Sequence, residues 1–469
     1  MPKITFMGAG STVFVRNIIG DSMCTPALQD SEIALYDIDA GRLKESQQVL
    51  ETLNRNINAG RAKITTHLGP ANRKAALKGA NYVVNAIQVG GYKPSTVIDF
   101  EIPKKYGLRQ TIADTTGIGG IFRALRTVPV ILDFARDMQD VCPDAWLLNY
   151  TNPMPTISTA LTRAGGVKFV GLCHSVQVCA RSLLHNLGLG EKYKGDKLQW
   201  KIAGINHMGW LLEITYNGKD LYPEIKKKAA EMFAEVKKRG GGRKVATDLK
   251  KKFGDKAWEQ PLMRFCHDMV RLCMMLNFGY YITESSEHNA EYHPYFIKDK
   301  YPQFIDAFNI PLDEYPRRCV AQIEGWKKHA KAMVGNPELT HKRSHEYGSY
   351  IMEAMETDVP ARIGGNVLNH GLITNLPRNM AVEVPCMVDR NGVQGIYVGD
   401  LPEQCAALNR TNINTHLLTV EAILTGKKEH IYHAAMLDPH TRAELSIDDI
   451  RAMVDDLIKA HGKMLPKFK

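Results

Sequence analysis

Apolar residues in the first 190 positions occur in short runs that end at Gly, Asp or Asn, and the stretches between these runs have helical spacing. The runs predicted to form strands are KITFMGAGST (3–12), EIALYDID (32–39), ANYVVNAIQVGG (80–91), AWLLNYTNPM (145–154) and VKFVGLCHS (167–175). The segments VFVRNIIGDSM (13–23) and RLKESQQVLETLNRNI (42–57) have the apolar spacing of amphipathic helices. Strands that alternate with helices predict a doubly wound parallel sheet of the Rossmann-like kind, with right-handed crossovers.

The pattern changes at about residue 196. LQWKIAGINHMGWLLEITYNGKDLYP (198–223) is typical of antiparallel strands with a turn at NGKD, and long helical stretches follow. IDDIRAMVDDLIKAHGKML (447–465) has the spacing of an amphipathic helix. The sequence therefore predicts an α/β unit over 1–195 and a helix-rich α+β unit over 196–469. No repeat or low-complexity linker separates them, so we expect the two units to pack together.

Composition narrows the class of protein. The chain has 469 residues, of which 44% are hydrophobic and 23% charged, as in ordinary globular proteins. No apolar run approaches the roughly 20 residues that a membrane-spanning helix needs. MPKITFMGAG lacks the apolar core of a signal peptide, and the nine scattered cysteines favour reduced thiols. We expect a cytoplasmic protein that does not bind membranes.

The formal net charge of +10 is concentrated in one segment. Residues 226–256 carry twelve Lys or Arg and four Asp or Glu. Such a run is either a solvated helix face or a binding patch. Because no nucleic-acid-binding motif accompanies it, a nucleic-acid partner is not expected.

The first strand ends in MGAGSTVF, a pattern typical of a dinucleotide-binding turn. Gly8 permits a tight turn, and Gly10 allows the backbone to approach a pyrophosphate at the N-terminus of the next helix. Ser11 and Thr12 are candidates to cap that helix or to donate to phosphate, whereas Val13 stands where the usual pattern has a third glycine.

Asp37, at the end of the second predicted strand, is a candidate to bind the ribose hydroxyls of NAD. An acid at this position favours NAD over NADP. The same pattern would also fit a Rossmann-like domain that binds no nucleotide.

A second group of candidates lies where later strands end. Cys173 and His174 follow an apolar strand, and His207 lies in GINHM after another. Ligands of open α/β sheets bind at the carboxyl ends of strands. One thiolate and one imidazole, from Cys173 and His207, suit a borderline divalent ion and leave positions open for substrate. Buried packing and a redox thiol remain alternatives.

These motifs together resemble glycoside hydrolase family 4, the NAD- and metal-dependent glycosidases. The resemblance extends from residue 3 to about residue 466. It rests on ITFMGAGST, QTIADTTGIGGIFRALRT, NYTNPM, GLCHSVQ, AGINHM, YYITESSEHNAEYHPYF and HAAMLDPHT, which occur in the family's order. The Cys-His-Ser-Val form at 173–176 is similar to the branch that holds α-galactosidases and α-galacturonidases, and other segments resemble the α-galacturonidases most.

The resemblance implies an N-terminal NAD-binding domain (1–195) and a catalytic and oligomerisation domain (196–469), arranged as in lactate and malate dehydrogenases. It implies an exo-acting α-galacturonidase that uses NAD and a divalent metal, with manganese expected. The implied reaction oxidises C3, removes the C2 proton, eliminates the leaving group, adds water and reduces C3 again. A homodimer or homotetramer is expected.

The resemblance also assigns candidate roles, each with a structural alternative. Tyr281 or Tyr280 is the expected base, although both could be core aromatics, and His174 is the expected acid or substrate contact. Asp114 is expected to bind metal-linked water or a sugar hydroxyl, or else to cap a turn. The remaining candidates are Asn149 near the nicotinamide, and Asn152, Arg123, Arg126, Glu287 and His288 near the sugar.

Three other functions compete with an α-galacturonidase. An α-galactosidase of the same family would lack an arginine facing the sugar's C6. A net dehydrogenase of the malate or lactate type would not need the thiolate-bound metal. A non-catalytic NAD-binding sensor would bind NAD without turnover of any glycoside.

Overall fold

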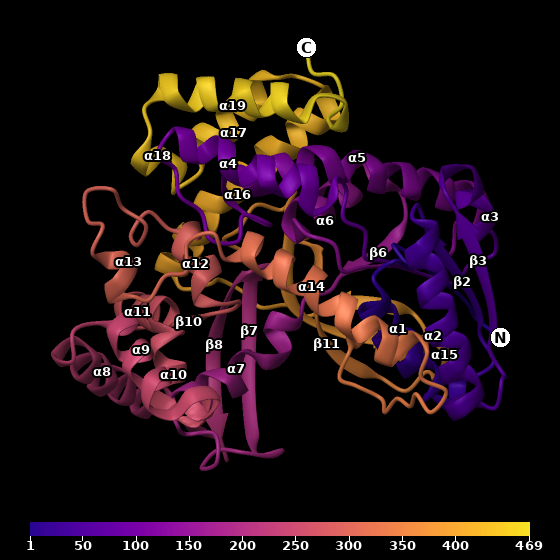
Figure 1. Ribbon diagram of the computed structural model, residues 1–469, viewed down its shortest axis with the longest axis horizontal. Coiled ribbons are helices and arrows are strands. Elements are labelled where there is room, and N and C mark those ends of the chain that lie inside the picture. The colour runs from indigo at the N-terminus through magenta and orange to yellow at the C-terminus, as the bar shows by residue number, and fades with distance from the viewer.

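A single mixed sheet runs through the molecule (Figure 1). The computed structural model describes the backbone of residues 1–469 and every side chain except those at positions 327 and 331. The strand order is β10-β8-β7-β12-β11-β6-β5-β4-β1-β2-β3, with β13 on β12 and β9 on β8. The strands are β1 (Lys3–Met7), β2 (Glu32–Asp37), β3 (Lys63–Leu68), β4 (Tyr82–Asn85), β5 (Trp146–Asn149), β6 (Lys168–Gly171), β7 (Leu198–Ile205), β8 (Met208–Tyr216), β9 (Lys219–Asp220), β10 (Tyr281–Ile282), β11 (Ala361–Leu368), β12 (Ala381–Asp389) and β13 (Gly392–Gly395).

The first six strands form the parallel part of the sheet, in the order β3-β2-β1-β4-β5-β6. This is the strand order of dinucleotide-binding folds, in which the order of the strands reverses between β1 and β4. The central strands β1 and β4 are almost wholly buried because helices cover both faces, which explains their continuous apolar runs. The predicted Rossmann-like sheet is confirmed, and it includes β3, which the apolar pattern did not single out.

The rest of the sheet is antiparallel. β7 and β8 form the predicted pair, and β10 lies beside β8. The hairpin of β11 and β12 lies between this pair and the parallel strands. One residue pair at each junction joins the hairpin to its neighbours: Asn366 with Gly171 on β6, and Glu383 with Gly204 on β7.

Helices surround the sheet and fill the second half of the chain. They are α1 (Thr12–Met23), α2 (Ala40–Asn58), α3 (Arg73–Leu77), α4 (Val97–Lys105), α5 (Gly117–Val141), α6 (Met154–Ala160), α7 (His174–Asn186), α8 (Tyr222–Lys238), α9 (Gly242–Phe253), α10 (Pro261–Cys266), α11 (Met269–Phe278), α12 (Ser286–Tyr292), α13 (Phe304–Ala307), α14 (Glu314–Val334), α15 (Tyr347–Thr357), α16 (Glu403–Thr425), α17 (Glu429–Leu437), α18 (Thr441–Glu444) and α19 (Ile447–His461). None of the helices so described is long and apolar enough to cross a membrane.

The two predicted halves of the chain share packing as well as a sheet. Helices α16, α17 and α19, from the C-terminal end, pack on α4 and α5 of the first half (Figure 1). The predicted amphipathic helix near the C-terminus is confirmed as α19, which buries Ile450, Met453, Val454 and Leu457. The largest hydrophobic cluster contains residues of both halves, and the division at residue 195 remains a prediction.

Candidate functional site

The glycine turn after β1 has the geometry predicted for a dinucleotide site. Gly8 has φ +90°, and a side chain there would meet the backbone of Ala86 at 2.8 Å. A side chain on Gly10 would meet the Asp37 carboxylate at 2.8 Å. Asp37 Oδ2 accepts a hydrogen bond from Gly10 N at 2.6 Å, so the acid lies against the turn that α1 follows. The turn, the helix N-terminus and the carboxylate thus fit a dinucleotide.

Other predicted cofactor residues have different surroundings. Ser11 is exposed at the N-cap of α1 and makes no capping bond with its side chain. Thr12 is buried, and its hydroxyl pairs with that of Ser46 at 2.9 Å. Asn149 is fully buried, and its amide bonds to Asn85 and Thr151. The side chains of Thr12 and Asn149 both make hydrogen bonds within the fold, and their contacts with a cofactor remain predictions.

Cys173 and His207 lie together, as predicted, and Glu284 joins them. The ligand atoms of this Cys–His–Glu cluster all lie within 4.8 Å of one another. Glu284 Oε2 is 3.4 Å from His207 Nε2 and 4.0 Å from Cys173 Sγ. A thiol, an imidazole and a carboxylate at such separations suit a divalent metal ion.

Local structure explains how the cluster is held. Cys173 is the N-cap of α7, directly after β6, and His207 forms the tight turn between β7 and β8 with φ +65°. Tyr292 OH lies 3.0 Å from His207 Nδ1, so this contact leaves Nε2 facing Glu284. A metal-binding histidine usually uses its second nitrogen in such a bond, which fixes the ring.

Hydrogen bonds between polar groups connect the strand that precedes Cys173 with the strand that precedes His207. Glu383 Oε1 accepts hydrogen bonds from Asn206 at 3.0 Å and from Asn366 at 3.1 Å. The Asn366 amide also donates to the carbonyl of Gly171 at 3.3 Å. These residues lie at the two sheet junctions, one residue from His207 and two from Cys173. They connect the strand ends that precede the two candidate ligands.

The electrostatics of the cluster follow from its burial. Burial, followed by the charges of Glu284 and Glu383, raises the pKa of the Cys173 thiol. Burial lowers the pKa of His207, so its imidazole is held neutral. Burial also raises the pKa of Glu383 to about 7. A bound cation would reverse these effects at the thiol, because it favours the thiolate.

A second polar group borders the cluster. His288 Nδ1 lies 3.5 Å from Glu284 Oε1, and His288 Nε2 lies 3.6 Å from Asp114 Oδ1. Although burial alone would raise it, the neighbouring His288 holds the pKa of Asp114 well below its usual range. Burial lowers the pKa of His288, but the charges of Glu284 and Asp114 outweigh it and raise the pKa to about 9. Asp114 and His288 therefore form a buried ion pair, the Asp–His pair.

Asn152 and Arg123 complete this side of the site. Asn152 Nδ2 donates to Asp114 Oδ2 at 3.3 Å, and its carbonyl accepts from Arg123 Nε at 3.3 Å. Arg123 also donates to Tyr315 OH at 3.4 Å. The structure thus brings together four candidates from three separate segments of the sequence: Asp114, Arg123, Asn152 and His288.

His174 has a partner that the sequence did not reveal. Its Nε2 lies 2.6 Å from Glu346 Oε1, and its side chain remains 51% exposed. The hydrogen bond to Glu346 is the main cause of a raised pKa for His174.

Two candidates need correction because their side chains are buried and bonded elsewhere in the fold. Tyr281 is fully buried, and its hydroxyl donates to Asp268 Oδ2 at 2.5 Å, so it belongs to the core below α11. The Arg126 side chain is 1% exposed and binds both oxygens of Asp99, at 3.1 and 2.6 Å. It therefore has no free donor pair for a sugar carboxylate.

The Glu287 carboxylate pairs with Arg318, and its contact with the sugar remains a prediction. Tyr280, the other tyrosine predicted as the base, packs edge-on against Tyr222 with ring centres 5.8 Å apart.

Sequence reasoning missed Glu284, Tyr292, Glu346 and Glu383. Glu284 and Tyr292 lie in the motif YYITESSEHNAEYHPYF, whose density of acids, tyrosines and histidine was a signal. Glu346 and Glu383 lie outside the quoted motifs, and no local pattern distinguishes them from other glutamates.

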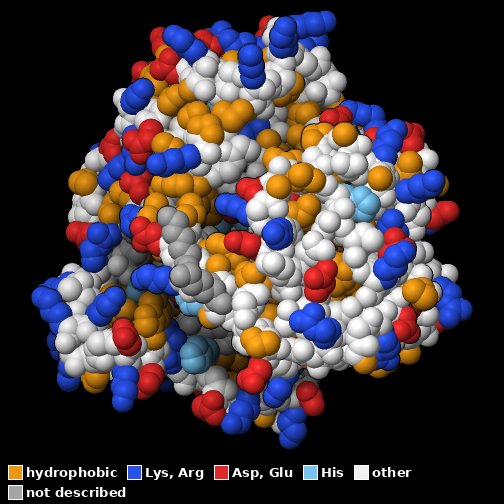
Figure 2. Space-filling view, turned by 45° about the vertical axis from the view of Figure 1, so that its right-hand side comes forward, with side chains coloured by type: hydrophobic (Ala, Val, Ile, Leu, Met, Phe, Trp, Pro, Cys, Tyr) orange, Lys and Arg blue, Asp and Glu red, His pale blue; other side chains and the backbone are white. Residues whose placement is uncertain are grey.

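The basic segment 226–256 forms the hairpin of α8 and α9. Its apolar residues face a core, including Met232, Val236, Val245 and Leu249, while its lysines lie mostly outside. Figure 2 shows Lys and Arg interspersed with Asp and Glu over one face of the molecule. The solvated-face interpretation fits this arrangement.

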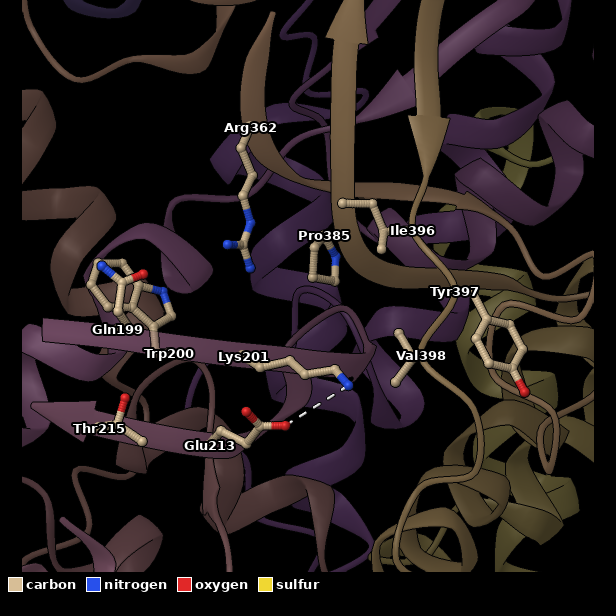
Figure 3. Close-up of a pocket in the computed structure, with 10 residues that line it drawn as sticks. All are labelled: Gln199, Trp200, Lys201, Glu213, Thr215, Arg362, Pro385, Ile396, Tyr397 and Val398. Carbon is tan, nitrogen blue, oxygen red and sulfur yellow. Dashed lines mark ion pairs between the residues drawn. The ribbon is translucent and has the colours of Figure 1, made fainter. Parts of the chain in front are cut away.

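A separate cavity of about 410 Å³ lies at the other end of β7 and β8 (Figure 3). Lys201 and Glu213 form an ion pair of 3.9 Å on its floor, and Arg362 points toward it. None of the predicted site residues lines this cavity.

Comparison with known proteins agrees with this geometry. The protein-family model described as "Family 4 glycosyl hydrolase" matches residues 3–189. A second family model, "Family 4 glycosyl hydrolase C-terminal domain", matches residues 202–441. An α-galactosidase of Bacillus subtilis (strain 168) is 58% identical over 469 residues, which is 100% of both chains. An α-galacturonidase of Thermoanaerobacter italicus is 26% identical over 460 residues, 97% of this chain and 95% of the other.

Among solved structures, a 6-phospho-α-glucosidase from gut microorganisms, in complex with NAD and Mn²⁺, matches with a TM-score of 0.75. It is 21% identical and covers 100% of both chains, so this likeness concerns the fold. The fold and the motif matches define an enzyme with a dinucleotide-binding core. The chain belongs to glycosyl hydrolase family 4.

Proposed function

We propose that the protein is an α-galactosidase that uses NAD and a divalent metal ion, with manganese expected. The observation that carries this proposal is the 58% identity to an α-galactosidase over the full length of both chains. The sequence motifs alone ranked α-galacturonides first, but the α-galacturonidase relative is only 26% identical. The α-galactosidase alternative is therefore preferred.

The arginines give a structural reason for the same choice. Recognition of a uronate favours an arginine with two free parallel N–H groups. Arg126 gives both of its groups to Asp99, and Arg123 bonds to Asn152 and Tyr315. The neutral C6 hydroxyl of a galactoside does not require such an arginine.

The residues fit both cofactors. Gly8, Gly10 and Asp37 would hold NAD, and Cys173 and His207 would hold the ion. When bound, NAD⁺ supplies reversible hydride chemistry and the divalent ion polarises a sugar oxygen. His174, whose Nε2 bonds to Glu346, would donate a proton to the leaving-group oxygen. Asp114, held ionised beside His288, would accept hydrogen bonds from sugar hydroxyls, and Asn152 would orient it.

A matched substrate assay tests the proposal. The purified protein, given NAD⁺, Mn²⁺ and a thiol reductant, should release nitrophenol from the α-galactoside and leave the α-galacturonide intact. Omission of NAD⁺, or chelation of the ion, should abolish release. Release from the galacturonide alone would contradict the proposed substrate and keep the family. Reduction of NAD⁺ with net turnover of a hydroxy acid would point to a dehydrogenase instead.

A further inference from the structure

A carboxylate in the site has no role in the function proposed so far. Glu284 lies between β10 and α12 and faces Cys173 and His207. Among the side chains that the structure describes, no Lys or Arg nitrogen lies within 4.0 Å of its carboxylate, and its ion-pair contacts are His207 and His288. His288 faces Glu284 Oε1, which leaves Oε2 directed at the thiol of Cys173 and the imidazole of His207.

Its distances to the other two side chains are those of metal ligands. With metal–ligand bonds of about 2.0–2.3 Å, neighbouring ligand atoms lie about 3–4 Å apart. Glu284 Oε2 lies 3.4 Å from His207 Nε2 and 4.0 Å from Cys173 Sγ. A carboxylate oxygen is also a ligand that Mn²⁺ favours.

The backbone holds Glu284 in an uncommon conformation. Its φ is +67°, in the left-handed region, which non-glycine residues rarely adopt. Arg271 donates to the Glu284 carbonyl, and Thr283 exchanges hydrogen bonds with Gly209 on β8. His207, across the cluster, also has positive φ, at +65°. Such strain persists where the surrounding structure imposes it, and it concentrates at functional sites.

We infer that Glu284 is a third protein ligand of the divalent ion, beside Cys173 and His207. The inference rests on the proposed metal site and extends it. A thiolate, a neutral imidazole and a carboxylate balance the two positive charges of the ion. The full set is present before a sugar binds, so the ion is held without substrate.

Metal binding by the full-length protein, stripped of metal and without sugar, tests this inference. Mn²⁺ is titrated and followed by the electron paramagnetic resonance signal of the free ion. Glu284→Gln, which keeps the shape and removes the charge, should weaken binding at least 10-fold, since loss of even an outer partner costs roughly 10–100-fold. Cys173→Ser should weaken it comparably. Glu213→Gln, an exposed glutamate on β8, is the matched control and should bind as the unaltered protein does.

The absorption spectrum of bound Co²⁺ distinguishes a residue that binds the ion from a residue that only lies beside a ligand. Glu284→Gln should keep the thiolate charge-transfer band, because Cys173 still binds, and change the d–d bands that report coordination. Circular dichroism and thermal unfolding establish that each variant folds. An unchanged Mn²⁺ affinity or an unchanged Co²⁺ spectrum for Glu284→Gln, with binding lost in Cys173→Ser, would overturn the inference and keep the metal site. Undiminished Mn²⁺ binding by Cys173→Ser would overturn both the inference and the proposed metal site.

Discussion

At the scale of single residues, burial decides what a charged side chain does. Asp37 and Arg126 were both predicted to bind ligands. Asp37 is half-buried against the glycine turn, whereas Arg126 is buried and bonds to Asp99 and to the carbonyl of Val89. The two residues should therefore respond to substitution in different ways.

Asp37→Ala should weaken NAD binding by about 10- to 100-fold, since a hydrogen bond to a charged group contributes about 1.5–3 kcal/mol. Mn²⁺ affinity should not change. Quenching of protein fluorescence by NAD gives the first quantity, and the Mn²⁺ titration gives the second. Asp39→Ala is the control: Asp39 caps α2 through Arg42 N, so its loss costs stability without costing NAD affinity. Equal NAD affinity in Asp37→Ala would contradict the assignment.

Arg126→Met should destabilise the protein by about 3–5 kcal/mol, because it removes the guanidinium that binds both oxygens of the buried Asp99 carboxylate and leaves only His461 beside it. Urea unfolding measures the change. Lys244→Met removes an exposed ion pair with Asp248 and should cost less than about 1 kcal/mol. If Arg126→Met instead left stability intact and altered the choice between galactoside and galacturonide, the corrected role of Arg126 would be wrong.

At the scale of elements, the two sheet junctions place the ligands. Gly171 ends β6 two residues before Cys173, and a side chain there would meet Met154 Sδ at 2.5 Å, Ser158 Oγ at 2.8 Å and Asn366 Cβ at 2.9 Å. The close approach of β11 to β6 therefore depends on glycine at this position.

Gly171→Ala should destabilise the protein by about 1–3 kcal/mol, the usual cost of overpacking, and weaken Mn²⁺ binding. Urea unfolding and the Mn²⁺ titration measure the two effects. Gly325→Ala, within α14, meets no atom closer than 4.0 Å and should be neutral or stabilising by up to about 1 kcal/mol. A loss of stability without any loss of metal affinity would show that the junction does not position Cys173.

The elements also show which features of the structure could be predicted from the sequence. Strand and helix periodicity predicted β1, β2, α1, α2 and α19, because each depends on local spacing. Cys173 and His207 were found because each follows an apolar strand. Glu284 was not found, because it lies 111 positions away from Cys173 along the chain. The helical spacing of Arg123 and Arg126 likewise could not reveal Asp99, which α4 contributes.

At the scale of the whole molecule, buried histidines link stability to pH. His293 is 1% exposed, and neither ring nitrogen has a hydrogen-bond partner among the described residues. Burial lowers its pKa to about 3. Because the unfolded state binds a proton at about pH 6.5 and the folded state does not, stability is complete above that pH and is lost as the pH falls below it.

His293→Leu should remove this dependence. Between pH 7 and pH 5 the variant should lose about 2 kcal/mol less stability than the unaltered protein, from about 1.5 pH units at 1.36 kcal/mol each. Urea unfolding at the two pH values measures the difference. His370→Leu, at an exposed histidine, should leave the dependence unchanged. An unaltered slope in His293→Leu would contradict the assigned burial effect.

The hairpin of β11 and β12 has a mechanical consequence. Cys173 follows the parallel strands, whereas His207 and Glu284 adjoin the antiparallel ones, and the strand ladder has one residue pair at each junction of the hairpin. An ion shared by the three side chains would act as a cross-link between the two parts. Metal loading should then slow amide hydrogen exchange at the ends of β6 and β7 together, since local opening of either part would require release of the ion.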